Sequence, residues 1–244
     1  MSIWKKIYNR WTKLRLQPIR VYCLHEICAK PEFPNETADD WIDIDAFKRT
    51  IIYMRQQGYV FISLSDAYQK ISTDIFRRKK NAVLTIDDCR QSLREIMPWL
   101  IEQKLPITLF VNGNYMDGKE HNVVGFNPFH CLTQAELNLY IKVSNGLISI
   151  QSHGYEHLDV TQMTEEEFKR QVEKNMDYIS VYQKQGVEYS TSNTKLHFYA
   201  YTWGHHNAQT DAILKELNII PVLTDGRKND NDISCIHRER FISI

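Results

Sequence analysis

Short apolar runs alternate along this chain with longer segments in which apolar residues recur every three or four positions. The runs predict β-strands and the helical spacing predicts α-helices between them. The expected strands are 20–25, 59–64, 82–86, 107–111, 147–151, 196–201 and 219–224, with 241–244 as a last strand. The expected helices are 45–57, a short one from Ser65, 90–103, 133–143, 164–185 and 207–217. This alternation predicts a mainly parallel α/β sheet, either open and doubly wound or closed into a barrel.

Local signals support several of these boundaries. Thr133 followed three residues later by Glu136 has the pattern of a capping box at the start of a helix. Pro98 predicts a kink or a restart within the helix expected at 90–103. Residues 31–44 have the composition of a loop. No linker, repeat or low-complexity segment divides residues 19–244, so we expect a single domain there.

The overall composition is that of a globular protein, with 43% hydrophobic and 25% charged residues among 244. Thirty basic residues balance thirty acidic ones, so no global field favours nucleic acid as a partner. The five cysteines contain no C-x2-C pair, which argues against a zinc ribbon or a disulfide framework. No apolar run is long enough to cross a bilayer and no secretion signal is visible, so we expect a cytoplasmic protein.

Residues 1–18 differ from the rest of the chain. The first twenty residues include six basic and no acidic side chains. Apolar residues, among them Trp4 and Trp11, recur at helical spacing over 3–16, and Pro18 ends the pattern. A basic amphipathic helix of this kind is typical of peripheral contact with the inner face of a membrane. The alternative is that its apolar face docks on the protein itself, and the pattern does not separate the two.

Candidate chemistry follows the predicted strands. Four of them end in polar residues that can bind metals or transfer protons: Asp87-Asp88, His153 with His157, His25, and Thr202 to His206. In parallel α/β sheets and barrels the carboxyl ends of the strands form the edge where active sites are assembled. The sequence therefore predicts one site built from these clusters.

The spacing of His153 and His157 is the most specific of these signals. Two imidazoles four residues apart can converge on one ion, and one carboxylate added to them leaves coordination positions open for water. Catalytic zinc needs such an open site. An Asp87-Asp88 pair alone is equally consistent with a helix N-cap, and a lone His25 with a structural role.

These motifs resemble those of the polysaccharide deacetylases, carbohydrate esterase family four, also called the NodB-homology domain. Leu-Thr-Ile-Asp87-Asp88 resembles the T-F-D-D motif, and Ser-His153-Gly-Tyr-Glu-His157 resembles S-H-[ST]-x-x-H. Tyr201-Thr-Trp203-Gly resembles the F-A-Y-P-Y-G loop of the poly-N-acetylglucosamine deacetylase subgroup, whose early Tyr-His is loosely similar to the strand ending at His25. The resemblance covers about residues 19–225.

The resemblance implies a fold and a metal site. The fold would be a deformed (β/α)7 barrel, forming a single catalytic domain over 19–244. Asp88, His153 and His157 would hold one divalent ion, expected to be zinc. The chain departs from the family motifs at five positions. Ile86 replaces Phe, Cys89 replaces Gly, and Gly154 stands where the family has Ser or Thr. Thr202 replaces Pro and Trp203 replaces Tyr in the loop expected to bind substrate.

The resemblance also implies roles in catalysis. Asp87 would be the catalytic base, His25 the general acid, and the backbone at Trp203 part of the oxyanion hole. Tyr201 and Trp203 are candidates for binding the sugar ring. The implied reaction removes an N-acetyl group from an amino sugar of a glycan or glycolipid and releases acetate. Two alternatives remain at this stage: hydrolysis of a small cyclic amide on the same barrel, and an inactive glycan-binding protein.

Overall fold

The computed structural model describes residues 17–30, 41–73, 79–122, 129–185, 196–229 and 233–243. The segment 3–16 lies outside these residues, so the predicted basic helix is not tested. Within the described part the main sheet has nine strands: β1 (Arg20–Leu24), β4 (Tyr59–Phe61), β5 (Lys80–Ile86), β6 (Ile107–Val111), β9 (Ile148–Ser152), β10 (Phe198–Ala200), β11 (Ile220–Leu223), β12 (Ile236–His237) and β13 (Glu239–Arg240).

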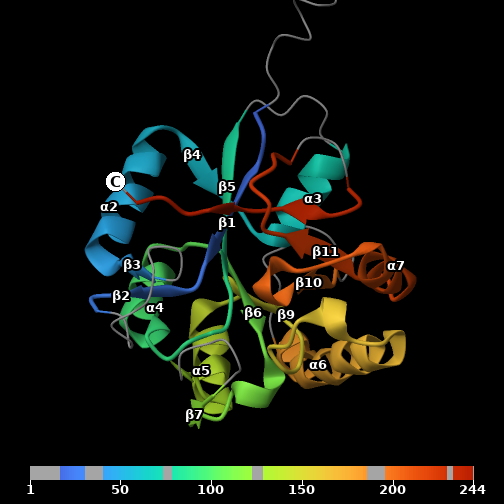
Figure 1. Cartoon of the computed structure of the whole chain (residues 1–244). Helices are drawn as coiled ribbons and strands as arrows, with labels where there is room; N and C mark the ends of the chain where they lie inside the picture. The colour runs from blue at the N-terminus through green and yellow to red at the C-terminus, as the bar shows by residue number, and fades with distance from the viewer. Residues whose placement is uncertain are drawn as a thin grey trace, which may run out of the picture.

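All pairings in this sheet are parallel, as the alternation of strands and helices predicted. The strand order is β12-β11-β10-β9-β6-β5-β1-β13, with β4 also paired to β5. β12 and β13 are separated by one residue yet lie at opposite ends of that order. The C-terminal segment 236–240 therefore joins β11 to β1, and Figure 1 shows it running across to the C-terminus beside α2. The fold is a nearly closed α/β barrel in one domain.

Six α-helices surround the sheet in the described residues (Figure 1): α2 (Ile44–Gln56), α3 (Leu64–Thr73), α4 (Leu93–Glu102), α5 (Gln134–Ser144), α6 (Glu165–Gln185) and α7 (Ala208–Glu216). Two small ribbons complete the fold, β2 (Glu26–Cys28) with β3 (Trp41–Asp43) and β7 (Glu120–His121) with β8 (Phe129–His130). Short 3₁₀ turns are η1 (Gly113–Tyr115), η2 (Val160–Gln162) and η3 (Thr202–Gly204). None of the described helices is long and apolar enough to span a membrane.

Most boundaries match the sequence expectations, and the differences have local causes. The capping box of Thr133 and Glu136 is present at the start of α5. Helix α4 begins at Leu93 instead of residue 90, because residues 89–91 are held in an extended contact with 130–132. The helix continues through Pro98 without a break. The strand expected at 241–244 was wrong: pairing ends at Arg240. Residues 41–43, expected in a loop, form β3.

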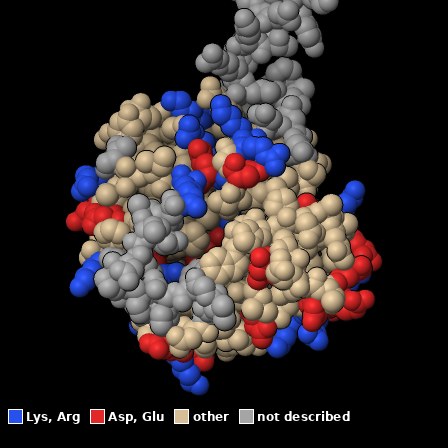
Figure 2. Space-filling model, in the orientation of Figure 1, with Lys and Arg blue, Asp and Glu red and all other residues tan. Residues whose placement is uncertain are grey.

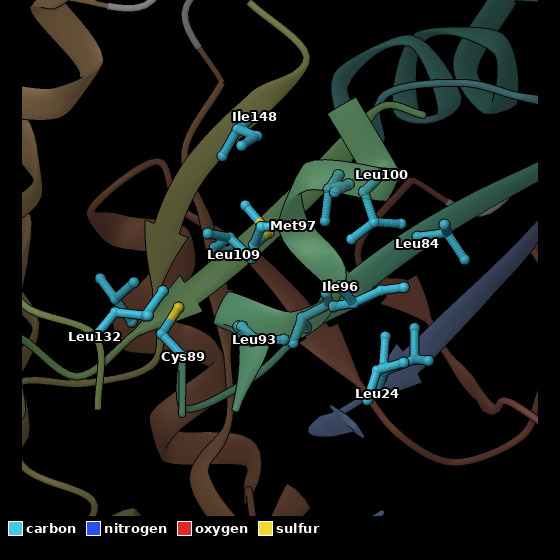
Figure 3. Close-up of a cluster of buried hydrophobic side chains, with 14 of the residues drawn as sticks. Leu24, Leu84, Cys89, Leu93, Ile96, Met97, Leu100, Leu109, Leu132 and Ile148 are labelled. Carbon is cyan, nitrogen blue, oxygen red and sulfur yellow. The ribbon is translucent and has the colours of Figure 1, made fainter. Parts of the chain in front are cut away.

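The core forms because α4 presents one apolar face to the sheet. Its buried residues Leu93, Ile96, Met97 and Leu100 follow the spacing of a helix that packs along one side. Figure 3 shows these side chains facing apolar residues of four strands: Leu24, Leu84, Leu109 and Ile148. The outer surface in Figure 2 carries interspersed acidic and basic groups, in keeping with the zero net charge.

Candidate active site

The predicted polar clusters come together at the carboxyl ends of the parallel strands. Asp87 follows β5, His153 follows β9, and His25 follows β1. These strands run in the same direction, so their ends meet at one edge. They open into a cavity of about 210 Å³, which is lined by Cys23, His25, Asp87, His153, His157, Tyr201, Trp203, Gly204, Thr224, Arg238 and Arg240.

Asp88, His153 and His157 converge as the spacing of the motif predicted. The Oδ1 atom of Asp88 lies 3.4 Å from Nε2 of His153 and 3.5 Å from Nε2 of His157. All three side chains are buried. Ligands about 2.0–2.1 Å from a tetrahedral zinc ion lie about 3.3–3.5 Å from one another, so these separations fit one shared ion.

The buried carboxylate of Asp88 supports the same assignment. Neither of its oxygens accepts a hydrogen bond of good geometry from the described residues. A buried anion without donors is costly, so it calls for a compensating cation. The guanidinium of Arg90 is distant, with Nε 3.9 Å from Oδ2. A donor set of two imidazoles and one carboxylate suits zinc or a similar divalent ion.

Both imidazoles direct Nε2 towards the carboxylate of Asp88. Nδ1 of His153 lies 2.8 Å from the carbonyl oxygen of Ala200, which makes Nδ1 the protonated nitrogen and directs Nε2 to the site. Burial lowers the pKa of His157 to about 4, so its ring is neutral near pH 7. Burial also disfavours the charged form of His153, but the neighbouring carboxylates of Asp87 and Asp88 raise its pKa overall. Binding of a metal ion at Nε2 of His153 therefore competes with protonation of that nitrogen.

The turn that carries the acidic pair is strained. Asp88 and Cys89 have φ angles of 62° and 51°, in the left-handed region that L residues avoid at a cost of roughly 1–2 kcal/mol each. Segment 131–132 holds the turn in place: the amide of Leu132 donates to Cys89, and the Cys131 thiol donates to the carbonyl of Asp88 at 3.1 Å. These tertiary contacts hold Cys89 in the left-handed conformation at the position where the family motif has Gly.

Asp87 faces the cavity from the same turn and is held by Arg238. Nη1 of Arg238 lies 2.6 Å from Oδ1 of Asp87, and Nη2 lies 2.8 Å from Oδ2, with both side chains buried. Burial alone would raise the pKa of Asp87, but Arg238, with His153 and His25, holds it below its ordinary value. Asp87 is therefore an ionised carboxylate near pH 7.

Arg238 was not among the residues expected from the sequence. It lies in a polar stretch, Cys-Ile-His-Arg, that matches no motif of the family. Its place in the chain, between the two short strands that close the barrel, is what brings its guanidinium inside. Thr85 and Thr224 accept its remaining hydrogen bonds, so the side chain is fixed.

His25 lines the same cavity as His153 and His157. Its side chain is half-buried, and its ring lies within 4.8 Å of both Cys23 and Asp87, measured between ligand atoms. The Nδ1 atom of His25 has no hydrogen-bond partner among the described residues. The ring of His25 lines the cavity, so it can meet a substrate that enters there, as a general acid must.

Tyr201 and Trp203 both line the cavity, but in different ways. Tyr201 is buried, and its hydroxyl donates to Asp211 at 2.8 Å, so only part of its ring faces the cavity. Trp203 is 40% exposed and stacks edge-on against His157, with ring centroids 5.1 Å apart. Trp203 has a φ of 60°, so its backbone is strained, and it lies beside His157. Strained residues of this kind tend to occur at functional sites.

The departure at Gly154 has a structural counterpart. Gly154 has a φ of +81°, and a Cβ atom there would lie 2.9 Å from the hydroxyl of Tyr199. The Tyr199 side chain thus leaves no room for a side chain at position 154. Asn112, which sequence reasoning also missed, donates to the carbonyls of His153 and Gly154 and fixes this loop.

Comparisons with known proteins agree with this fold. The profile of the polysaccharide deacetylase family matches residues 76–222. IcaB from Ammonifex degensii shares the fold with a TM-score of 0.73 and 19% identity, over 93% of this chain and 92% of that chain. The Streptococcus pyogenes deacetylase PplD has a TM-score of 0.74 and 21% identity, over 93% and 94% of the two chains. The BpsB deacetylase domain from Bordetella bronchiseptica has a TM-score of 0.69 and 15% identity, over 93% of this chain and 96% of that chain.

At these identities the likeness to solved structures concerns the fold. No curated protein matches the sequence significantly. The family profile, in contrast, spans more than half of the chain and includes Asp87, Asp88, His153 and His157. The chain belongs to the polysaccharide deacetylase family.

Proposed function

We propose that this protein removes an N-acetyl group from an amino sugar of a glycan or glycolipid, with the help of one divalent metal ion. The observation that carries the proposal is the convergence of Asp88, His153 and His157 at a cavity that the two histidines line together with Asp87 and His25. The three ligands leave positions open for water and substrate, as hydrolysis of an amide requires.

Asp88, His153 and His157 would hold the ion, for which zinc is the expected identity. Once bound, such an ion polarises the acetamide carbonyl and lowers the pKa of water to about 7. Asp87 is the base that takes the proton of the attacking water. Arg238 keeps Asp87 ionised and orients its two oxygens.

His25 is the acid that protonates the departing amine. It suits this role because its ring opens into the cavity and because an imidazole transfers protons near neutral pH. The backbone N–H of Trp203 is proposed to stabilise the developing oxyanion, a contribution of roughly 3–4 kcal/mol per donor in comparable sites. The exposed Trp203 ring is proposed to stack on the sugar.

The proposed subgroup is that of poly-N-acetylglucosamine deacetylases. It rests on the motif at Tyr201 to Gly204, on His25 directly after the first strand, and on structural likeness to IcaB and BpsB over more than 90% of each chain. The alternative of a small cyclic amide as substrate has no feature of the cavity in its favour.

The test combines elemental analysis with product detection. Purified protein should contain about one equivalent of a divalent metal ion. It should also release acetate and a free amine from an N-acetylglucosamine oligomer, but none from a cyclic amide. The Asp88→Asn variant should lose both the metal and the activity. Wild-type protein that binds metal but cleaves only the cyclic amide would overturn the sugar assignment; protein that binds no metal would overturn the mechanism.

A further inference from the structure

A second cluster of reactive side chains lies outside the catalytic cavity. Cys235 and His237 are two residues apart in the extended segment that leads into β12, so their side chains point to the same face. Arg238 points to the opposite face, towards Asp87. Asp225 follows β11, the strand that pairs with β12. The cluster and the proposed active site therefore lie on opposite sides of the closing segment.

Cys235, His237 and Asp225 are aligned as a nucleophile, a base and an orienting acid. The Sγ atom of Cys235 lies 3.5 Å from Nε2 of His237. On the other side of the ring, Nδ1 lies 3.0 and 2.9 Å from the two carboxylate oxygens of Asp225. A carboxylate only accepts, so Nδ1 carries the proton and Nε2 presents its lone pair to the thiol. This is the order of roles in cysteine–histidine–acid triads.

The acid and the base are both fixed. Burial would raise the pKa of Asp225, but hydrogen bonds from Arg227 and His237 lower it, so the carboxylate is charged at neutral pH. Asn229 holds the backbone of His237 from both sides: its Oδ1 accepts from the amide at 2.8 Å, and its Nδ2 donates to the carbonyl at 2.6 Å. The imidazole is therefore held between its two neighbours.

Cys235 differs from the other four cysteines. It is partly exposed, whereas Cys23, Cys28, Cys89 and Cys131 are buried. Burial raises the pKa of Cys23 and of Cys28 to about 12, so neither thiol ionises at neutral pH. Cys235 also lines a surface cavity of about 680 Å³ whose other lining residues include Tyr68, Leu196, Pro221, Leu223 and Ile233.

We propose that Cys235 is a nucleophilic thiol that reacts with disulfides or soft electrophiles bearing an apolar group. His237 takes the thiol proton, and the thiolate attacks one sulfur of the incoming disulfide. The S–S bond of the reagent breaks, a mixed disulfide forms on Cys235, and the departing thiolate takes the proton from His237. The apolar lining of the adjacent cavity sets the preference for an apolar reagent.

The charged groups around the triad bear on its response to pH. On the thiol side the cavity contains Asp211 and Lys215, and Arg227 contacts Asp225. On the far side of His237 a separate cavity is lined by charged residues of both signs: Arg20, Lys80, Lys228 and Glu239. Asp225 is the charged group in contact with the imidazole.

In the experiment the full chain is labelled with 2,2′-dipyridyl disulfide, and the reaction is measured by the amount of thiopyridone released. At about pH 5.5 we expect one thiol to react about tenfold faster than free cysteine, because the gain in thiolate outweighs the loss of intrinsic nucleophilicity. Cys235→Ser should remove this phase. A disulfide with anionic groups should react more slowly than the neutral one, relative to free cysteine.

Variants of the base separate activation from access. His237→Ala should slow the fast phase by about tenfold at pH 5.5 but not at about pH 9, where thiols ionise without help. Asp225→Asn should act in the same direction and is a second test if His237→Ala fails to fold. His205→Ala is the matched control, because His205 makes a similar 2.9 Å contact with Asp159 but is not part of the group formed by Cys235, His237 and Asp225. Equal slowing at both pH values, or no thiol faster than free cysteine, would overturn the proposal.

Discussion

Arg238 donates two hydrogen bonds to the carboxylate of Asp87, although the two residues are 151 positions apart in the chain. Both side chains are buried, so the pair is shielded from solvent. The contact sets the charge of the proposed base and at the same time ties the closing segment of the barrel to β5.

Replacing Arg238 by Met should therefore affect both stability and pH dependence. An unpaired buried carboxylate costs about 3–5 kcal/mol, which denaturant unfolding at pH 7 would measure. Because Arg238 lowers the pKa of Asp87, the stabilisation is present above the unfolded pKa of about 3.9 and is lost as pH falls below it. The loss of unfolding free energy in Arg238→Met should therefore be smaller at acid pH than at pH 7.

The same variant should move the acid limb of the kcat/KM profile to higher pH, since Asp87 without its cation is protonated more easily. Arg20→Met is the control, because Arg20 pairs with Glu239 at an exposed position. An acid limb that stays in place in the Arg238→Met variant would show that Asp87 is not the base.

Asp87→Asn and Asp88→Asn should separate the base from the metal ligand. Asp87→Asn should keep the metal, measured by elemental analysis, and lose about 100-fold or more in deacetylation rate, the usual contribution of a positioned base. Asp88→Asn should lose the metal as well. Metal loss in both variants would make Asp87 a ligand.

His25→Ala tests proton donation to the leaving group. Deacetylation of an amide should fall by about 100-fold, because an amine anion cannot leave unprotonated. Hydrolysis of an activated aryl acetate should fall much less, since a phenolate leaves without help. His121→Ala is a suitable control, as this histidine pairs with Asp117 and does not line the cavity. Equal losses on both substrates would argue against a role as acid.

Gly154→Ala should destabilise the protein by about 2–4 kcal/mol, from the left-handed φ and the contact with the Tyr199 hydroxyl. Tyr199→Phe in the same chain should recover part of the loss, because it removes the contact and leaves the φ. Gly58→Ala isolates the φ cost, since its φ of +83° is similar and nothing lies within 4 Å. Thermal and denaturant unfolding measure the stability of all three variants. If the effects of Gly154→Ala and Tyr199→Phe on stability simply add, the steric contact does not contribute to the loss.

Removing residues 1–17 distinguishes the two interpretations of the basic segment. If it contacts a membrane, binding to anionic liposomes should vanish, since each basic residue near such a surface contributes about 1 kcal/mol. Hydrolysis of a soluble substrate should then persist. If the segment docks on the protein, the truncated chain should unfold at a lower temperature and liposome binding should be weak in both forms.

The sequence determined the local elements of this fold and the convergence of Asp88, His153 and His157. Strand and helix periods, together with the capping box at Thr133, placed most elements within a few residues. Asp88, His153 and His157 could be predicted to meet because parallel strands end at one edge, whatever the details of packing. Their chemistry is readable because ligand spacing within a motif is a local property.

The tertiary structure decided what depends on pairing between distant segments. Segment 236–240 carries no strong strand pattern, yet it joins β11 to β1 and brings Arg238 to Asp87. The Tyr199 hydroxyl occupies the space next to Gly154, and no sequence motif shows that these two residues meet. The alignment of Cys235 and His237 with Asp225 also depends on the register between β11 and β12. Contacts of this kind arise only when the barrel closes, because no local pattern encodes which distant side chain fills a given buried position.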